Sequence, residues 1–249
     1  MGVAIAIALT VAAMLVHEFG HWVAMRHFGI EVDAIGIGFW RRKLKIICGV
    51  PVLFGVLPLG AYIRMTNEGK QRLLSLSYGE QALVYGAGIM ANIFFSAVVL
   101  NILLLVMCHG SWRVVYAPIF WIIFLPPILI WFGRRFFCAM IPITGIIAAI
   151  WFGMLSMHAT AFPIVGPIGL TKVIVHDSPT IVAGIIEGAV ISLMWAALNA
   201  IPFVPTDGWN IFAAFLRKHR PGWVQPLFEV EFAFYIAILF LAFTNDLYR

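Results

Sequence analysis

Six long apolar segments dominate this sequence, and they restrict the chain to one class of fold. Each is close to the roughly 20 residues that a helix needs to cross the hydrocarbon core of a bilayer. They occupy approximately residues 3–25, 82–108, 114–132, 136–157, 180–203 and 229–245. A soluble domain is about 45–50% apolar, whereas this chain of 249 residues is 63% hydrophobic. We therefore predict an all-α polytopic membrane protein with about six transmembrane helices.

The segment 33–65 has a different character. It is rich in β-branched and aromatic residues, and Gly and Pro interrupt it at short intervals. This pattern is typical of strands and turns rather than of a helix. We predict a membrane-associated β-hairpin between the first two transmembrane helices.

Basic residues gather in the short segments between the apolar ones. With six helices and an external N-terminus, thirteen of the 16 Lys and Arg residues fall on the cytoplasmic side, as the positive-inside rule requires. These thirteen lie at positions 26, 41–45, 64–72, 134–135 and 217–220. The pattern predicts a multi-pass protein of the cell membrane with both termini outside. It also accounts for the net charge of +5 without a nucleic-acid partner.

His17, Glu18 and His21 form an H-E-x-x-H pattern inside the first apolar segment. Residues four apart share one face of a helix, so both imidazoles can reach one metal ion, and neutral imidazole suits zinc. Glu18 is placed to accept a proton from a metal-bound water. The alternative is a pair of histidines packed inside a helix bundle. A carboxylate on the same membrane helix costs about 2.5 kcal/mol or more, which favours the metal site.

Asp207 is the best candidate for a third metal ligand. A catalytic zinc ion usually has three protein ligands and one open position. Pro202 and Pro205 prevent regular helix just before Asp207, and irregular backbone at membrane depth is tolerated where it lines a cavity. The alternative is that Asp207 caps a helix beginning near Trp209.

Several motifs, taken in order, resemble the site-2 protease family, the intramembrane zinc metalloproteases of peptidase family M50. They are HEFGH at 17–21, LPLGAYIRM at 57–65, AGIMAN at 87–92, GPIG at 166–169 and NAIPFVPTDG at 199–208. They resemble the family's zinc motif, its hairpin P-L-G-G-Y, its A-G-P-x-A-N, its G-P-x-G and its N-x-x-P-x-x-x-x-D-G. The chain departs from these patterns at Ala61, Ile89 and Trp209, none of which is an expected ligand or base.

The resemblance implies roles for individual residues. His17, His21 and Asp207 would bind one Zn²⁺ per chain. Glu18 would be the general base and then the acid for the leaving amine, and Asn199 would hold the substrate backbone or the oxyanion. Three hairpin residues would pair with a substrate unwound into a strand, namely Gly60, Ala61 and Tyr62. Five further positions belong to the structural motifs, namely Asn92, Gly166, Pro167, Pro202 and Gly208.

The resemblance also implies a single intramembrane metalloprotease domain over 1–249. Many bacterial relatives carry a PDZ domain between the second and third core helices. Here residues 109–160 supply hydrophobic segments instead, so we expect a member without that domain. The expected parts are a first core helix at 1–32, the hairpin at 33–65, a second core helix at 78–110, an extra helical hairpin at 111–160, the GPIG segment with the third core helix at 161–212 and a C-terminal helix at 213–249.

The sequence thus predicts a membrane metalloendopeptidase that cuts membrane-protein substrates within or near their transmembrane segments. Its expected partners are the lipid bilayer and a transmembrane protein or peptide. One alternative is a zinc-binding membrane chaperone or scaffold without cleavage, but a pure binder does not need Glu18 beside two zinc ligands. Another is a metal transporter, although the other apolar segments supply no second ladder of His or Asp.

Overall fold

The structure, a computed structural model, describes residues 1–47, 50–107 and 180–248. Within these ranges the fold is mostly helical, and four helices are long and apolar enough to span a membrane. They are α1 (Gly2–His27), α3 (Tyr78–Met107), α7 (Ile181–Ala200) and α9 (Val224–Tyr248). They confirm four of the six predicted segments. The segments predicted at 114–132 and 136–157 lie outside the described residues, as does the GPIG motif.

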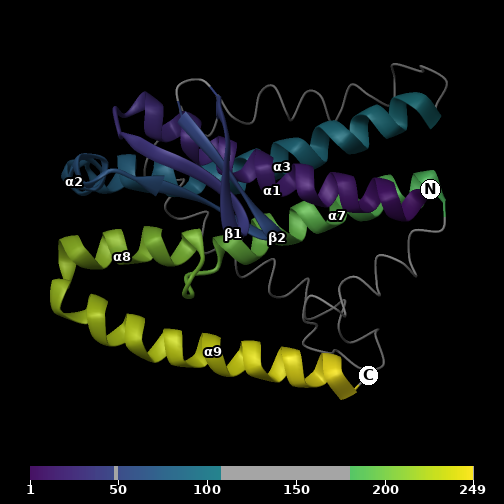
Figure 1. Cartoon of the computed structure of the whole chain (residues 1–249). Helices are drawn as coiled ribbons and strands as arrows, with labels where there is room; N and C mark the ends of the chain where they lie inside the picture. The colour runs from purple at the N-terminus through teal and green to yellow at the C-terminus, as the bar shows by residue number, and fades with distance from the viewer. Residues whose placement is uncertain (48–49, 108–179, 249) are drawn as a thin grey trace.

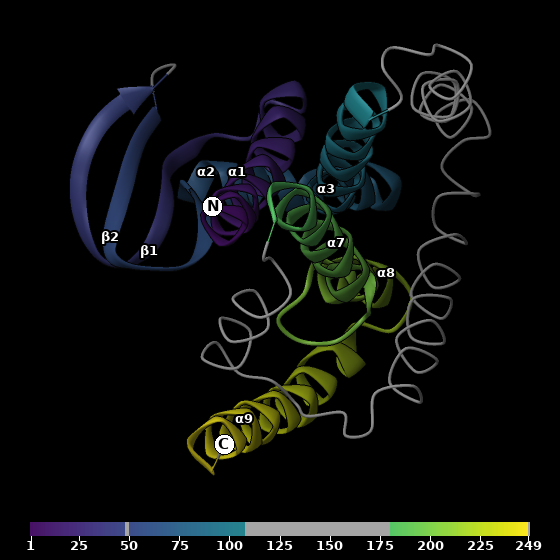
Figure 2. The same ribbon diagram turned by 90° about the vertical axis from the view of Figure 1, so that its right-hand side faces the viewer.

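Helices α1, α3 and α7 pack against one another, and α9 lies apart from this bundle (Figures 1 and 2). Small residues allow the close approach, as is common between membrane helices. A Cβ added to Gly20 of α1 would lie 2.5 Å from the carbonyl oxygen of Ala87 in α3. One added to Gly188 of α7 would lie 2.5 Å from the Cβ of Leu9 in α1. Larger residues at either glycine would push the helices apart.

Two buried hydroxyl groups tie α3 to α7. The Ser96 Oγ donates to the carbonyl oxygens of Asn92 and Ala189, at 2.9 and 3.0 Å. The Ser192 Oγ donates to the same Asn92 carbonyl at 3.1 Å. A buried hydroxyl with a backbone partner avoids the free-energy cost of an unpaired polar group. These bonds therefore fix the spacing of α3 and α7 near Asn92.

The predicted hairpin is confirmed as two antiparallel strands, β1 (Val32–Ile47) and β2 (Val50–Met65). Residues 35–37 of β1 have β2 partners on both sides, at 61–63 and at 52–54. The hairpin therefore bends back on itself and lies beside α1 (Figure 2). An apolar cluster of Met14, Ile37 and Val52, with Trp195 of α7 against it, joins the hairpin to the bundle.

Three short helices complete the described fold: α2 (Asn67–Ser75), α8 (Asp207–His219) and η1 (Pro221–Trp223). No apolar pattern predicts α2, because its nine residues include few apolar ones and give no membrane signal. The boundary predicted between the third core helix (161–212) and the C-terminal helix (213–249) falls inside α8. It therefore does not separate two helices. α8 packs on α3. This contact brings Asp207, the first residue of α8, close to α1.

Candidate metal centre

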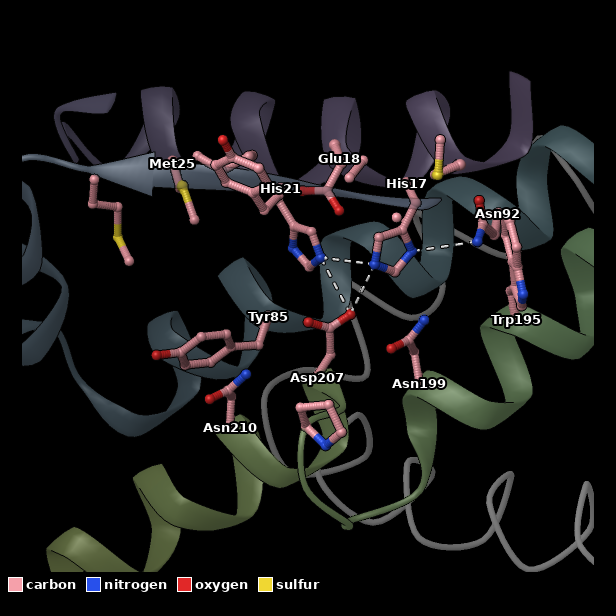
Figure 3. A pocket seen from close by; sticks show the side chains of 17 residues that line it. His17, Glu18, His21, Met25, Tyr85, Asn92, Trp195, Asn199, Asp207 and Asn210 are labelled. Carbon is pink, nitrogen blue, oxygen red and sulfur yellow. Dashed lines mark hydrogen bonds and ion pairs between the residues drawn. The ribbon is translucent and has the colours of Figure 1, made fainter. Parts of the chain in front are cut away.

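Three side-chain donor atoms meet where α1, α3 and α8 come together (Figure 3). The Nε2 atoms of His17 and His21 lie 3.1 Å apart. The Oδ2 atom of Asp207 lies 3.1 Å from the first nitrogen and 3.2 Å from the second. In the part of the chain that the structure describes, this is the one group of three His, Cys, Asp or Glu residues placed to share a metal ion.

The triangle has the size that a tetrahedral metal requires. Zinc bonds to nitrogen and oxygen are about 2.0–2.1 Å long, which places neighbouring tetrahedral ligands about 3.3 Å apart. The three observed separations, 3.1, 3.1 and 3.2 Å, are close to that value. Two imidazoles and one carboxylate also match the ligand types of catalytic zinc sites, which keep a fourth position open. The residues present therefore fit a zinc ion.

A glycine of α3 makes room for the two histidines. A Cβ added to Gly88 would lie 2.3 Å from His21 Nε2 and 2.8 Å from His17 Nε2. Any other residue would occupy the space where the donor atoms converge. Gly88 belongs to the AGIMAN motif, which by itself indicates no role for this residue. Its spacing of four residues from Asn92 was the available signal, since such residues share a helix face.

Backbone and side-chain partners hold the outer ring nitrogens of the histidines. His21 Nδ1 lies 2.8 Å from the carbonyl oxygen of Val84. A carbonyl only accepts, so Nδ1–H is the donor, and the Nε2 lone pair of neutral His21 faces the centre. Outer partners of this kind orient metal-binding imidazoles and increase their affinity for the metal.

Asn92 is placed to do the same for His17. The side chain is 0% exposed, and its Nδ2 lies 3.3 Å from His17 Nδ1. Its Oδ1 is buried and has no hydrogen-bond partner among the described residues. Turning the amide over would let Oδ1 accept from His17 Nδ1–H. Both histidines would then present Nε2 to one point.

Asp207 is the first residue of α8 but not its cap. The Thr206 side chain accepts the N–H of Trp209 and caps this helix, which excludes the capping alternative for Asp207. The Oδ2 atom of Asp207 instead faces the Nε2 atoms of both histidines, at 3.1 and 3.2 Å. A carboxylate that binds a metal ion is ionised, so Asp207 would supply the anionic ligand of the set.

A cavity of about 530 Å³ opens beside these donors. Glu18, Asn92 and Asn199 line it together with the triangle, and so do hairpin residues 60–63. Figure 3 shows the Glu18 carboxylate directed toward the two imidazoles, and Asn199 directed from α7 toward Asp207. Among the other predicted residues, Gly208 is buried beneath the loop, Pro202 is exposed away from the cavity, and Gly166 and Pro167 lie outside the described residues.

The cavity also has lining residues that sequence reasoning missed. Met14 and Met25 lie on the histidine face of α1, three residues before His17 and four after His21, so helical spacing could have indicated them. No local pattern marks three more of them. They come from α3, α7 and α8, namely Tyr85, Trp195 and Asn210.

Together, the helices and this site define a membrane protein with two histidines and a carboxylate placed to share one metal ion. The sequence matches the family model of peptidase family M50 over residues 4–244. The chain therefore belongs to this family, the site-2 proteases.

Individual relatives match a smaller part of the chain. The regulator of sigma-E protease RseP of Escherichia coli is 33% identical over 94 residues, which cover 32% of this chain and 20% of that protein. Protease RseP of Yersinia pestis is 32% identical over 96 residues, covering 33% and 21%. A putative zinc metalloprotease of Xylella fastidiosa is 28% identical over 103 residues, covering 36% and 23%. The matches thus span about a fifth of the length of these relatives.

Replacing Asn92 with Ala should weaken Zn²⁺ binding about 10–100-fold, because His17 loses the partner that orients its ring. Competition with a chelator on the purified protein measures this affinity. Asn101→Ala is the matched control, since Asn101 lies on the same helix and donates only to its own helix, at Ala97. Equal zinc affinity in the two variants would show that Asn92 does not support the centre.

Proposed function

We propose that this protein is an intramembrane zinc metalloprotease that hydrolyses peptide bonds within or near the transmembrane segments of membrane proteins. One observation carries the proposal: a zinc-sized triangle of two imidazoles and a carboxylate lies beside Glu18 in a cavity between membrane-spanning helices. Membership of peptidase family M50 supports it.

His17, His21 and Asp207 would hold the zinc ion. When bound, the ion would polarise the scissile carbonyl and lower the pKa of its water toward about 7. Glu18 lines the same cavity but is not one of the three donors. It is free to accept the proton of the attacking water and to return it to the leaving amine nitrogen.

The amide of Asn199 and the hairpin would position the substrate. Residues 61–63 pair with β1 along one edge, and within the described residues no strand pairs with their other edge. An extended peptide could add there as a further strand. A helical substrate hides its carbonyls in its own hydrogen bonds, so it must unwind before attack. Pairing with the hairpin would compensate for the helix bonds lost in unwinding.

The arrangement of helix ends supports a cytoplasmic location for the site. The two chain ends lie at the same end of the bundle (Figure 1), and α1 ends at the opposite end in Arg26 and His27. By the positive-inside rule, that basic end would be cytoplasmic. His17 is ten residues, or about 15 Å, from the end of α1. α3 ends and α7 begins on the same side of the bundle (Figure 1).

Glu18→Gln should leave zinc content unchanged and reduce cleavage about 10²–10⁴-fold, because the amide cannot accept the proton. The measurement is zinc content and cleavage of a single-pass membrane protein in reconstituted vesicles. Glu68→Gln, at an exposed position of α2, is the control and should retain wild-type cleavage. Unchanged cleavage in Glu18→Gln would rule out Glu18 as the base.

Asp207→Ala removes a direct ligand of the zinc ion. It should therefore lower zinc affinity by more than the roughly 10–100-fold expected when a residue that only supports a ligand is lost. The helix should persist, because Thr206 still caps it. Chelator competition and circular dichroism measure the two quantities. Asn210→Ala, on the same helix and cavity, is the control. Full zinc retention in Asp207→Ala would remove Asp207 from the ligand set.

A further inference from the structure

Asp207 reaches the metal centre at the end of an irregular loop, residues 201–206. Pro202 and Pro205 have no N–H, which leaves four backbone donors in the loop. Three of them bond within the loop or to the end of α7, as Ile201 N to Leu198 O, Phe203 N to Ile201 O and Thr206 N to Phe203 O. The fourth, that of Val204, requires an acceptor from elsewhere because Val204 is only 2% exposed.

The acceptor is a carboxylate on the last helix. Glu231 Oε2 of α9 accepts the Val204 N–H at 3.1 Å. Buried backbone donors are almost always paired, so this bond completes the hydrogen bonding of the loop. We infer that Glu231 is a positioning residue of the metal centre: it holds the loop in the conformation that presents Asp207 to His17 and His21. The inference rests on the proposed zinc site.

Glu231 gains a polar partner from this bond. It lies in a candidate membrane span, residues 221–240, in which no residue is buried within the described part of the protein. A carboxylate inside a membrane carries a high free-energy cost. Figure 2 shows α9 standing away from the bundle. Apolar contacts of its first turn, from Val224 and Leu227, reach the cluster of Val204 and Trp209. The Glu231 bond is a polar link at the same place.

The neighbouring acid provides the contrast. Glu229 is exposed on the same helix, and its carboxylate accepts from Gln225 of that helix at 2.8 Å. Within the described residues, no hydrogen bond joins Glu229 to the loop. Both acids carry the same formal charge, so a difference between their variants reports the bond to Val204 rather than charge on α9.

Substitutions of Glu231 on the full-length purified protein test the inference. Glu231→Ala removes the acceptor and should weaken Zn²⁺ binding about tenfold, within the range for outer supports of a metal site. Glu231→Gln keeps a carbonyl oxygen and should bind zinc within about twofold of wild type, as should Glu229→Ala. Chelator competition gives these affinities without any measurement of cleavage.

Hydrogen exchange of the metal-free protein provides the second readout. The Val204 amide should exchange at least about tenfold faster in Glu231→Ala than in wild type, and at the wild-type rate in Glu231→Gln and Glu229→Ala. If Glu231→Ala does not fold, Glu231→Asp replaces it, because its shorter side chain should lose the bond and show the same acceleration. Wild-type exchange and zinc affinity in the variant that lacks the bond would overturn the inference. If the wild-type protein bound zinc but did not cleave the substrate, the proposed protease function would fail and this inference would stand.

Discussion

The convergence of three donor atoms within about 3 Å is the constraint on which the rest of the described structure depends. His17 and His21 come from the first helix, and Asp207 follows 186 residues after the second of them. Their meeting requires α1 and α3 to touch, which Gly20 and Gly88 permit. It also requires the chain to leave α7 in an irregular loop rather than continue as a helix. The close packing of α1 on α3 and the irregular loop after α7 are thus both needed to form the site.

The membrane makes every unpaired polar group near this site expensive, and the structure supplies partners for several groups that position the donors. Val84 fixes the outer nitrogen of His21, and Asn92 lies against that of His17. Thr206 caps α8, and we assign the Val204 N–H to Glu231. These partners come from α3, from the N-cap of α8 and from α9, and together they hold the donors in place. A centre prepared in this way loses less entropy on binding the ion.

Much of this could be predicted from sequence, because it depends on local patterns. Apolar length indicated the spanning helices, and the Gly- and Pro-interrupted segment 33–65 indicated the hairpin. Helical spacing placed His17 and His21 on one face. Other features depend on contacts between distant segments, and no local pattern encodes them. The space left by Gly88, the choice of Thr206 over Asp207 as cap and the bond of Glu231 to the loop are of this kind, and α2 was too short and polar to detect.

X-ray absorption at the zinc edge of the purified, zinc-loaded protein tests the central claim most directly, because it reports the atoms that bind the ion. We predict one zinc per chain with nitrogen and oxygen ligands at about 2.0–2.1 Å and the multiple-scattering signature of two imidazoles. Sulfur ligands at about 2.3 Å would contradict this account, since they would place the metal at cysteines. Failure to bind zinc at all would contradict it equally.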